Sequence, residues 1–101
     1  MAIPRILIVG QDPSVLARTI RETRVLGYDV VGVTANADLR HLWRNERFDA
    51  VVLRTGIDDE TRKDFLEEIM DRNPDLPVFD RDDPEEEMGR FLEGVVKKLN
   101  S

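Results

Sequence analysis

The chain has 101 residues and a mass of 11.6 kDa, which is enough for one compact domain with a core of its own. Hydrophobic residues make up 41% and charged residues 36%, and an excess of acidic side chains gives a formal net charge of −6. This charge argues against nucleic acid as a partner, because phosphate contacts need a positive surface. The absence of cysteine excludes a disulfide framework, a thiolate metal site and a cysteine nucleophile.

The apolar runs of the sequence are only a few residues long, so none is expected to span a membrane. Residues 1–4 lack the basic start and the apolar stretch of a signal peptide. We therefore expect a cytoplasmic protein without a membrane partner, folded as a single domain over residues 1–101.

Four short apolar segments recur along the chain and predict strands. They are residues 5–9 (RILIV), 29–34 (DVVGVT), 49–53 (DAVVL) and 77–79 (PVF). The first three are nearly continuous in hydrophobicity, which is typical of strands buried on both faces of a parallel sheet. Pro77 has no backbone N–H to donate, so the fourth segment is expected at a strand start or a sheet edge.

Helical patterns with recognisable ends separate these strands. Asp12 is expected to cap the first helix, Pro13 to open it and Gly27 to end it. The second helix is expected to begin near Asn36 and to bury apolar side chains at helical spacing, namely Leu39, Leu42 and Trp43.

Two further helices are predicted in the second half of the chain. The third begins at Asp58 or Asp59, ends at residues 73–74 and buries Phe65, Leu66, Ile69 and Met70. The fourth has the strongest start signal, with Asp83 as the cap, Pro84 in the first position and three glutamates after it. Its broad apolar face consists of Met88, Phe91, Leu92, Val95, Val96 and Leu99.

Strands and helices therefore alternate, in the order β-α-β-α-β-α-β-α. Right-handed crossovers place helices on both faces of a parallel sheet, two on each face if the strand order is 2-1-3-4. The predicted fold class is α/β, a three-layer α/β/α sandwich around about four parallel strands with flavodoxin-like winding.

In such a sheet, ligands bind at the carboxyl ends of the strands. Gly10, Gln11 and Asp12 follow the first strand, Arg54 follows the third, and Asp82 comes shortly after the fourth. The sequence contains neither a GxGxxG motif nor a P-loop, no nucleophile is paired with a base, and the single histidine lies among charged neighbours in a helix. We therefore expect no enzyme activity and no cofactor.

Residues 3–79 resemble the receiver domain of bacterial response regulators in order and spacing. The resemblance rests on the stretch ILIVGQDPSVLARTIRETRVLGYDVVGV, on the third strand FDAVVL and on the fourth strand within PDLPVF. It implies a site in which an acidic pair after the first strand and an aspartate ending the third strand hold Mg²⁺. That aspartate accepts a phosphoryl group, and a Thr or Ser after the fourth strand and a Lys after the fifth contact the phosphate.

This chain departs from the receiver pattern at each of these positions. The acidic pair falls on Gly10 and Gln11, the phosphoacceptor position on Arg54, and the Thr or Ser position on or near Asp82. No lysine is a candidate for the one after the fifth strand. Mg²⁺ needs carboxylate ligands and an acyl phosphate needs a carboxylate on which to form, so neither Mg²⁺ binding nor phosphotransfer is expected.

Asp12 and Arg54 can each be explained by a structural role instead of a role in ligand binding. Asp12 is expected chiefly to cap the first helix. Arg54 is expected to form an ion pair with Asp12 or Asp82, although it could also fix an anion.

The C-terminal part of the chain also departs from the receiver pattern. It is about one strand–helix unit shorter than a usual receiver, and its last helix resembles the last receiver helix more than the fourth. Deletion of the fourth helix and fifth strand is the simplest interpretation. Truncation after an ordinary fourth helix is the alternative, and a fifth strand supplied by another chain remains open.

The leading functional hypothesis is a non-phosphorylatable, receiver-like module of the two-component or phosphorelay type that signals or scaffolds through protein contacts. The partner is another protein or a second copy of the chain, with Phe79, Phe91 and Val96 as interface candidates. The alternative is a small-molecule or phosphoryl-carrier domain on the same flavodoxin-like fold. A purely structural domain of a larger assembly is a third possibility.

Overall fold

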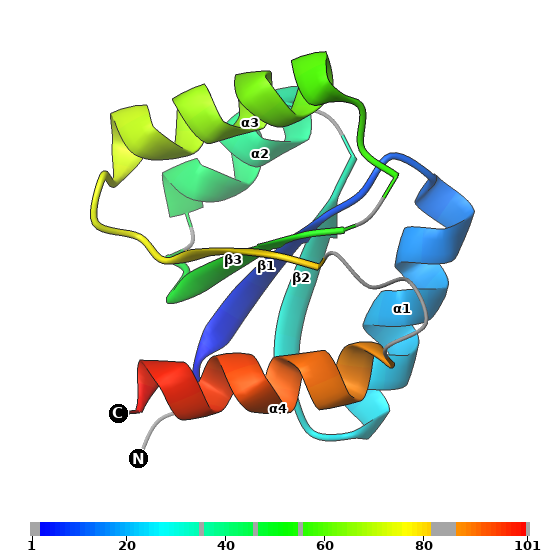
Figure 1. Cartoon of the computed structure of the whole chain (residues 1–101). Coiled ribbons are helices and arrows are strands. Elements are labelled where there is room, and N and C mark those ends of the chain that lie inside the picture. The colour runs from blue at the N-terminus through cyan, green and yellow to red at the C-terminus, as the bar shows by residue number, and fades with distance from the viewer. Residues whose placement is uncertain (1–2, 35, 46, 55, 82–86, 101) are drawn as a thin grey trace.

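Strands and helices alternate through the whole chain, as Figure 1 shows. The computed structural model describes residues 3–34, 36–45, 47–54, 56–81 and 87–100. The strands are β1 (Arg5–Val9), β2 (Asp29–Val33), β3 (Ala50–Leu53) and β4 (Val78–Asp80). The helices are α1 (Pro13–Val25), α2 (Asn36–Asn45), α3 (Asp59–Arg72) and α4 (Met88–Leu99).

The four strands form one parallel sheet in the order β2-β1-β3-β4, which confirms the predicted fold class and strand order. The strand limits differ from the predicted ones by one residue at most. The fourth strand is shifted by one residue, to Val78–Asp80. Pro77 lies just before it, and its carbonyl oxygen accepts a hydrogen bond from the N–H of Val51 (2.9 Å).

Helices cover both faces of the sheet (Figure 1). Alternate strand residues belong to two separate apolar layers. The layer under α2 and α3 is built around Leu7, Val9, Val51, Leu53, Phe65 and Ile69. The layer under α1 and α4 is built around Ile6, Ile8, Leu16, Val52, Leu92 and Val95. This double burial explains why the strands are continuously hydrophobic. In the described part of the chain, no helix has the length and apolarity required to cross a membrane.

Helix ends follow the local signals of the sequence. The Asp12 carboxylate accepts hydrogen bonds from the N–H groups of Ser14 (2.9 Å) and Val15 (3.3 Å), so it caps α1 as predicted. Gly27 adopts φ 99° just after that helix, a conformation that favours glycine. Asp58 caps α3 by accepting from the N–H of Thr61 (2.8 Å).

One predicted core residue of α3 is wrong. Phe65 and Ile69 are buried and Leu66 is partly buried, but the Met70 side chain is 61% exposed. Successive helix residues are turned by about 100°, so Met70 points well away from the direction that Ile69 takes into the core. A helix that packs on one sheet face only buries a narrower apolar stripe than the sequence predicted.

The predicted start of α4 is also wrong. The helix begins at Met88 rather than Pro84, because Glu87 has extended backbone angles (φ −64°, ψ 137°) through which a helix cannot continue. Met88 is the point at which the chain enters the core next to the end of α1, where the Tyr28 hydroxyl donates to the Gly89 carbonyl (3.3 Å). Tertiary packing therefore sets this helix end. Asp83 lies outside the described residues.

The position of α4 bears on the two interpretations of the C-terminal part of the chain. A right-handed crossover from β4 to a further parallel strand on its open side would place the helix beside α2 and α3. Instead α4 lies on the opposite face, packed against α1 and the same apolar layer. This placement favours deletion of the fourth helix and fifth strand over truncation after an ordinary fourth helix.

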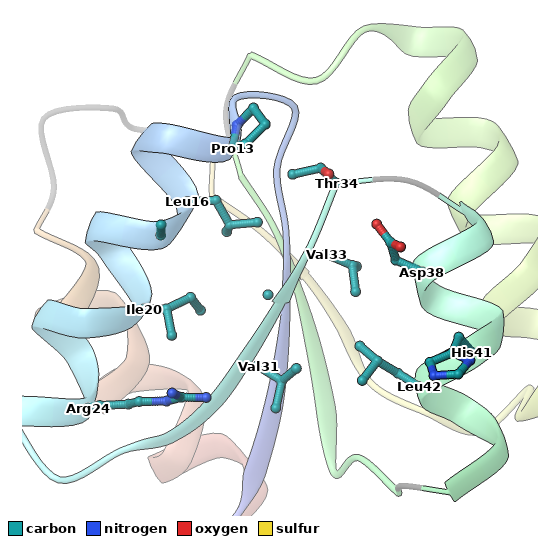
Figure 2. Close-up of a pocket in the computed structure, with 12 residues that line it drawn as sticks. Pro13, Leu16, Ile20, Arg24, Val31, Val33, Thr34, Asp38, His41 and Leu42 are labelled. Carbon is teal, nitrogen blue, oxygen red and sulfur yellow. The ribbon is translucent and has the colours of Figure 1, made fainter.

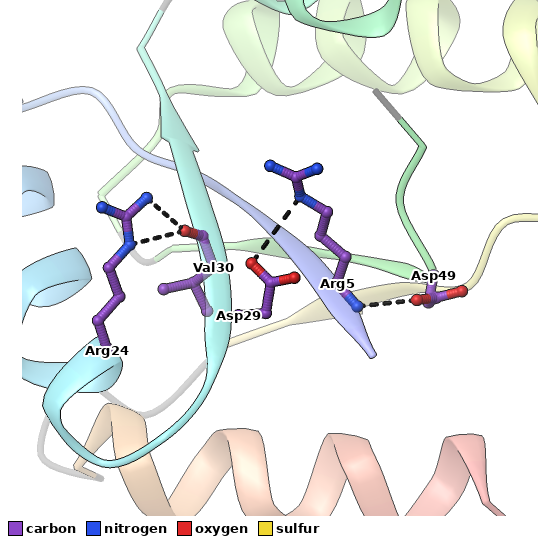
Figure 3. Close-up of polar contacts among 5 residues, drawn as sticks. All are labelled: Arg5, Arg24, Asp29, Val30 and Asp49. Carbon is purple, nitrogen blue, oxygen red and sulfur yellow. Dashed lines mark hydrogen bonds and ion pairs between the residues drawn. The ribbon is translucent and has the colours of Figure 1, made fainter. Parts of the chain in front are cut away.

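The outer edge of β2 is partly covered by a side chain. The Val33 carbonyl accepts from the N–H of Gly10, so Val33 faces β1 and Val30, three positions before it, faces outward. Figure 3 shows Arg24 of α1 donating through Nε (3.2 Å) and Nη2 (2.9 Å) to the Val30 carbonyl. On the neighbouring strand, the N–H of Arg5 donates to the Asp49 carboxylate (2.8 Å).

Candidate functional site

The candidate site lies where β1, β3 and β4 end. Backbone hydrogen bonds continue one residue past each strand, from Gly10 to Val33 (3.1 Å), from Arg54 to Val9 (2.9 Å) and from Arg81 to Leu53 (3.0 Å). The backbones of Gly10, Arg54 and Arg81 are therefore held in fixed register with the sheet. Side chains from this edge have a rigid base, as a binding site needs.

Gln11 serves a structural contact in the loop after β1. Its side-chain amide donates to the Asp58 carboxylate, and its amide oxygen accepts from the N–H of Asp58 (3.1 Å). Hydrogen bonds from Thr61 and then from Gln11 hold the pKa of Asp58 below its ordinary value. Gln11 thus ties the end of β1 to the start of α3, and Asp58 is occupied by this contact and by capping.

Arg54 lies beside Gly10 but does not form the expected pair with Asp12. A Cβ atom on Gly10 would lie 3.5 Å from Cδ of Arg54, so the arginine stem passes close over this glycine. Within the described ranges, Arg54 makes no ion pair with Asp12, whose carboxylate is engaged at the start of α1. The predicted Asp12–Arg54 ion pair is therefore wrong. Asp82, the other predicted partner, lies outside the described residues.

Burial and two neighbouring arginines determine the electrostatic environment of Arg54. Burial lowers the pKa of Arg54, the guanidinium groups of Arg81 and Arg18 lower it further, and the Asp12 carboxylate opposes them as the smallest of these influences. The Nε atom of Arg54 is buried and finds no hydrogen-bond acceptor among the described residues. Three positive side chains thus converge where the receiver resemblance implies a carboxylate.

Two of these three arginines were not predicted from the sequence. Arg81 follows β4 directly and is 7% exposed. A sequence signal for it existed, because residues that follow neighbouring parallel strands share one edge of the sheet. Arg18 offered no such signal, since its contribution depends on which side of α1 faces the ends of β3 and β4.

The arginines border two cavities. The larger, of about 520 Å³, lies between α1, the start of α4 and the ends of β3 and β4, and all three arginines line it. The smaller, of about 190 Å³, lies on the α3 side of Arg54. Arg62 of α3 and Asp80 form an ion pair at the smaller cavity.

A separate groove of about 500 Å³ lies over the outer edge of β2, between α1 and α2. Figure 2 shows Leu16 and Ile20 facing Leu42 across the strand, so the walls are mostly apolar. The single histidine, His41, lies on the α2 side of this groove together with Asp38. In the ranges that the structure describes, no group of three or more His, Asp or Glu side chains is arranged to hold a metal ion.

Comparison with solved structures identifies the fold. The chain superimposes on the chemotaxis response regulator CheY4 of Vibrio cholerae with a TM-score of 0.62 and 16% sequence identity, over 99% of this chain and 82% of that chain. The chain has a receiver-like fold. No family model matches the sequence. A search of curated proteins also gave no match.

The side chains at this edge differ from those that the receiver resemblance implies. The carboxyl ends of the strands present guanidinium groups, which donate charge-assisted hydrogen bonds to anions. The residue at the end of β3 is an arginine, which cannot form an acyl phosphate. Guanidinium groups at this edge of the sheet can contact negatively charged groups.

Proposed function

We propose that this protein is a receiver-like signalling or scaffolding module that does not accept a phosphoryl group and acts through protein–protein contacts. The proposal places it in a phosphorelay or two-component setting, in the cytoplasm, without enzyme activity, Mg²⁺ or another cofactor. The response-regulator fold supports the signalling class. The lack of cysteine is compatible with a reducing compartment.

The observation that carries the proposal is the replacement of carboxylates by other groups at the carboxyl ends of β1 and β3. Gly10 has no side chain to offer, Gln11 is engaged with Asp58, and Arg54 brings a positive charge. Mg²⁺ would approach against Arg54, Arg81 and Arg18, whose charges repel a divalent cation. These features support a module whose input is not phosphorylation.

We expect no covalent phosphoryl adduct after incubation with acetyl phosphate or phosphoramidate in the presence of Mg²⁺. The side chain at position 54 cannot attack a phosphodonor as a carboxylate does, and positions 10 and 11 supply no acidic metal ligands. Intact-mass measurement checks this, with a response regulator that has the full acidic site as a positive control. A stoichiometric gain of one phosphoryl group would contradict the proposal.

We further propose a second copy of the chain as a partner, docked through the open edge of β4 and the neighbouring surface of α4. Pro77 and Arg81 bond to β3, so the backbones of the two alternate residues, Val78 and Asp80, face outward. An unpaired strand edge is a ready site for another strand. Two-fold, isologous dimers are the commonest oligomers.

The register of such a dimer follows from the backbone directions. In an antiparallel pair about a two-fold axis, Val78 would lie opposite Asp80 of the second copy, and each such pair exchanges two backbone hydrogen bonds. The two Phe79 side chains would then be direct neighbours on the α4 face. Phe91 and Val96, both only partly buried in one copy, lie in the same apolar layer as Phe79 and would extend the contact.

We expect a dimer in sedimentation or light-scattering measurements at micromolar concentration. Val96→Glu should shift the chain to monomer, because it places a charge in the apolar contact. Lys97→Gln is the matched control, since it also changes the net charge by −1 but lies on the exposed side of α4. A monomer at all concentrations, or equal behaviour of the two variants, would contradict this partner. Circular dichroism confirms that each variant remains folded.

A further inference from the structure

The cavity of about 520 Å³ bordered by three arginines has the features of a small-ligand site rather than of an unfilled gap. Its volume falls within the range of about 300–1,000 Å³ that is typical of ligand pockets. It opens at the carboxyl ends of parallel strands, where ligands bind in open α/β sheets. Ligand binding at this cavity would be a further function, and it does not depend on the proposed signalling role.

The charge in this cavity comes from three different elements: Arg18 of α1, Arg54 after β3 and Arg81 after β4. Like charges gathered at a partly buried site repel one another, and that repulsion contributes to the lowered pKa of Arg54. A bound anion would relieve the repulsion and would offer acceptors to guanidinium donors. Arginine suits tetrahedral oxyanions well, because its planar fork donates two parallel hydrogen bonds.

The carboxylates of this wall that the structure describes do not pair with Arg18 or Arg54. Glu22 and Glu87 line the cavity, and Asp12 lies near Arg54. Within the described segments, Glu22 and Glu87 make no ion pair with Arg18 or Arg54. Both glutamates are exposed, so their side chains can turn towards water when an anion enters. They weaken the positive potential without occupying the donors of Arg18 and Arg54.

The rest of the cavity wall indicates what the anion is attached to. Val15, Leu26 and Met88 contribute apolar surface beside the arginines. A free phosphate ion would leave this surface uncovered, whereas a phosphomonoester could place an organic group against it. We infer that the cavity binds a small phosphomonoester reversibly, with the phosphate at Arg18 and Arg54 and the organic group against Val15, Leu26 and Met88.

The test is a titration of the ¹⁵N-labelled full chain with phenyl phosphate and, separately, with inorganic phosphate at constant ionic strength. We expect saturable amide shifts around Arg18 and Arg54 with a dissociation constant in the millimolar range or below, and tighter binding of phenyl phosphate. Binding of neither probe would overturn the inference. Equal affinity for both probes would overturn the assignment of the organic group.

Charge-matched variants make the test specific. Arg54→Gln should weaken phenyl phosphate binding about tenfold or more, since a charge-assisted contact is lost. Arg21→Gln removes the same charge from an exposed position of α1 outside the cavity and should change the affinity less than about twofold. Glu22→Gln should tighten binding, because it removes a carboxylate from the wall. Equal weakening by Arg54→Gln and Arg21→Gln, or no tightening by Glu22→Gln, would overturn the inference.

Discussion

Phe65→Ala is expected to lower the free energy of unfolding by about 3–5 kcal/mol. Phe65 is 1% exposed and is the largest fully buried side chain in the protein's described part, at the centre of the layer between the sheet and α3. Without the ring, the chain loses the favourable free energy of transferring it from water into the core. The substitution also leaves a cavity that the rigid strands cannot fill. Domains of this size have about 5–15 kcal/mol of stability in total, so the variant should unfold at much lower denaturant concentration.

Urea denaturation followed by circular dichroism measures this effect. Met70→Ala is the matched control, because Met70 lies on the same helix with its side chain 61% exposed. Its cost should stay within about 0.5 kcal/mol. A large loss of stability in the Met70 variant, or a small one in the Phe65 variant, would mean that α3 packs with a different face towards the sheet.

Leu92→Ala is expected to cost about 2–5 kcal/mol, for the same reason, on the opposite face of the sheet. Leu92 is fully buried between α4 and the layer that includes Ile6, Ile8 and Val52. The effect should be this large only if α4 is docked on the sheet with Leu92 buried. The prediction therefore tests the docking of α4 through this face of the helix.

The same denaturation experiment measures the Leu92 effect. Arg90→Ala serves as its control, because Arg90 is exposed in the first turn of the same helix and its loss should change stability little. If the two variants had similar midpoints, α4 would not be docked on the sheet as the structure has it.

Much of the fold could be predicted from the sequence, because its signals are local. The strands are continuous apolar runs, Asp12 and Asp58 cap helices through N–H groups two or three residues away, and Gly27 takes a positive φ. Each of these features involves neighbours in the sequence. The start of α4 is different, since contacts with α1 set it, and no property of residues 82–87 alone reveals those contacts.

The candidate site was predicted less completely, and one residue shows why. The sequence suggests that Arg54 needs a carboxylate and that Asp12 is available. In the structure the Asp12 carboxylate already accepts from Ser14 and Val15, which lie in its own helix and cost little conformational entropy to reach. The proximity of Arg54 and Arg81 follows from the pairing of β3 with β4, but the approach of Arg18 depends on how α1 packs, and no spacing in the sequence encodes it.

The contact of Arg24 with β2 limits how far these chains can assemble. A strand arriving at the β2 edge would have to displace two guanidinium hydrogen bonds from the Val30 carbonyl. Among the described residues, no backbone hydrogen bond occupies the outward groups of Val78 and Asp80. A sheet that accepts a new strand at both edges can grow into a fibre. If the proposed two-fold pairing through β4 occurs, it would use the accessible edge of both copies. Because Arg24 partly covers the β2 edge, we expect assembly to stop at two chains rather than to continue into a fibre.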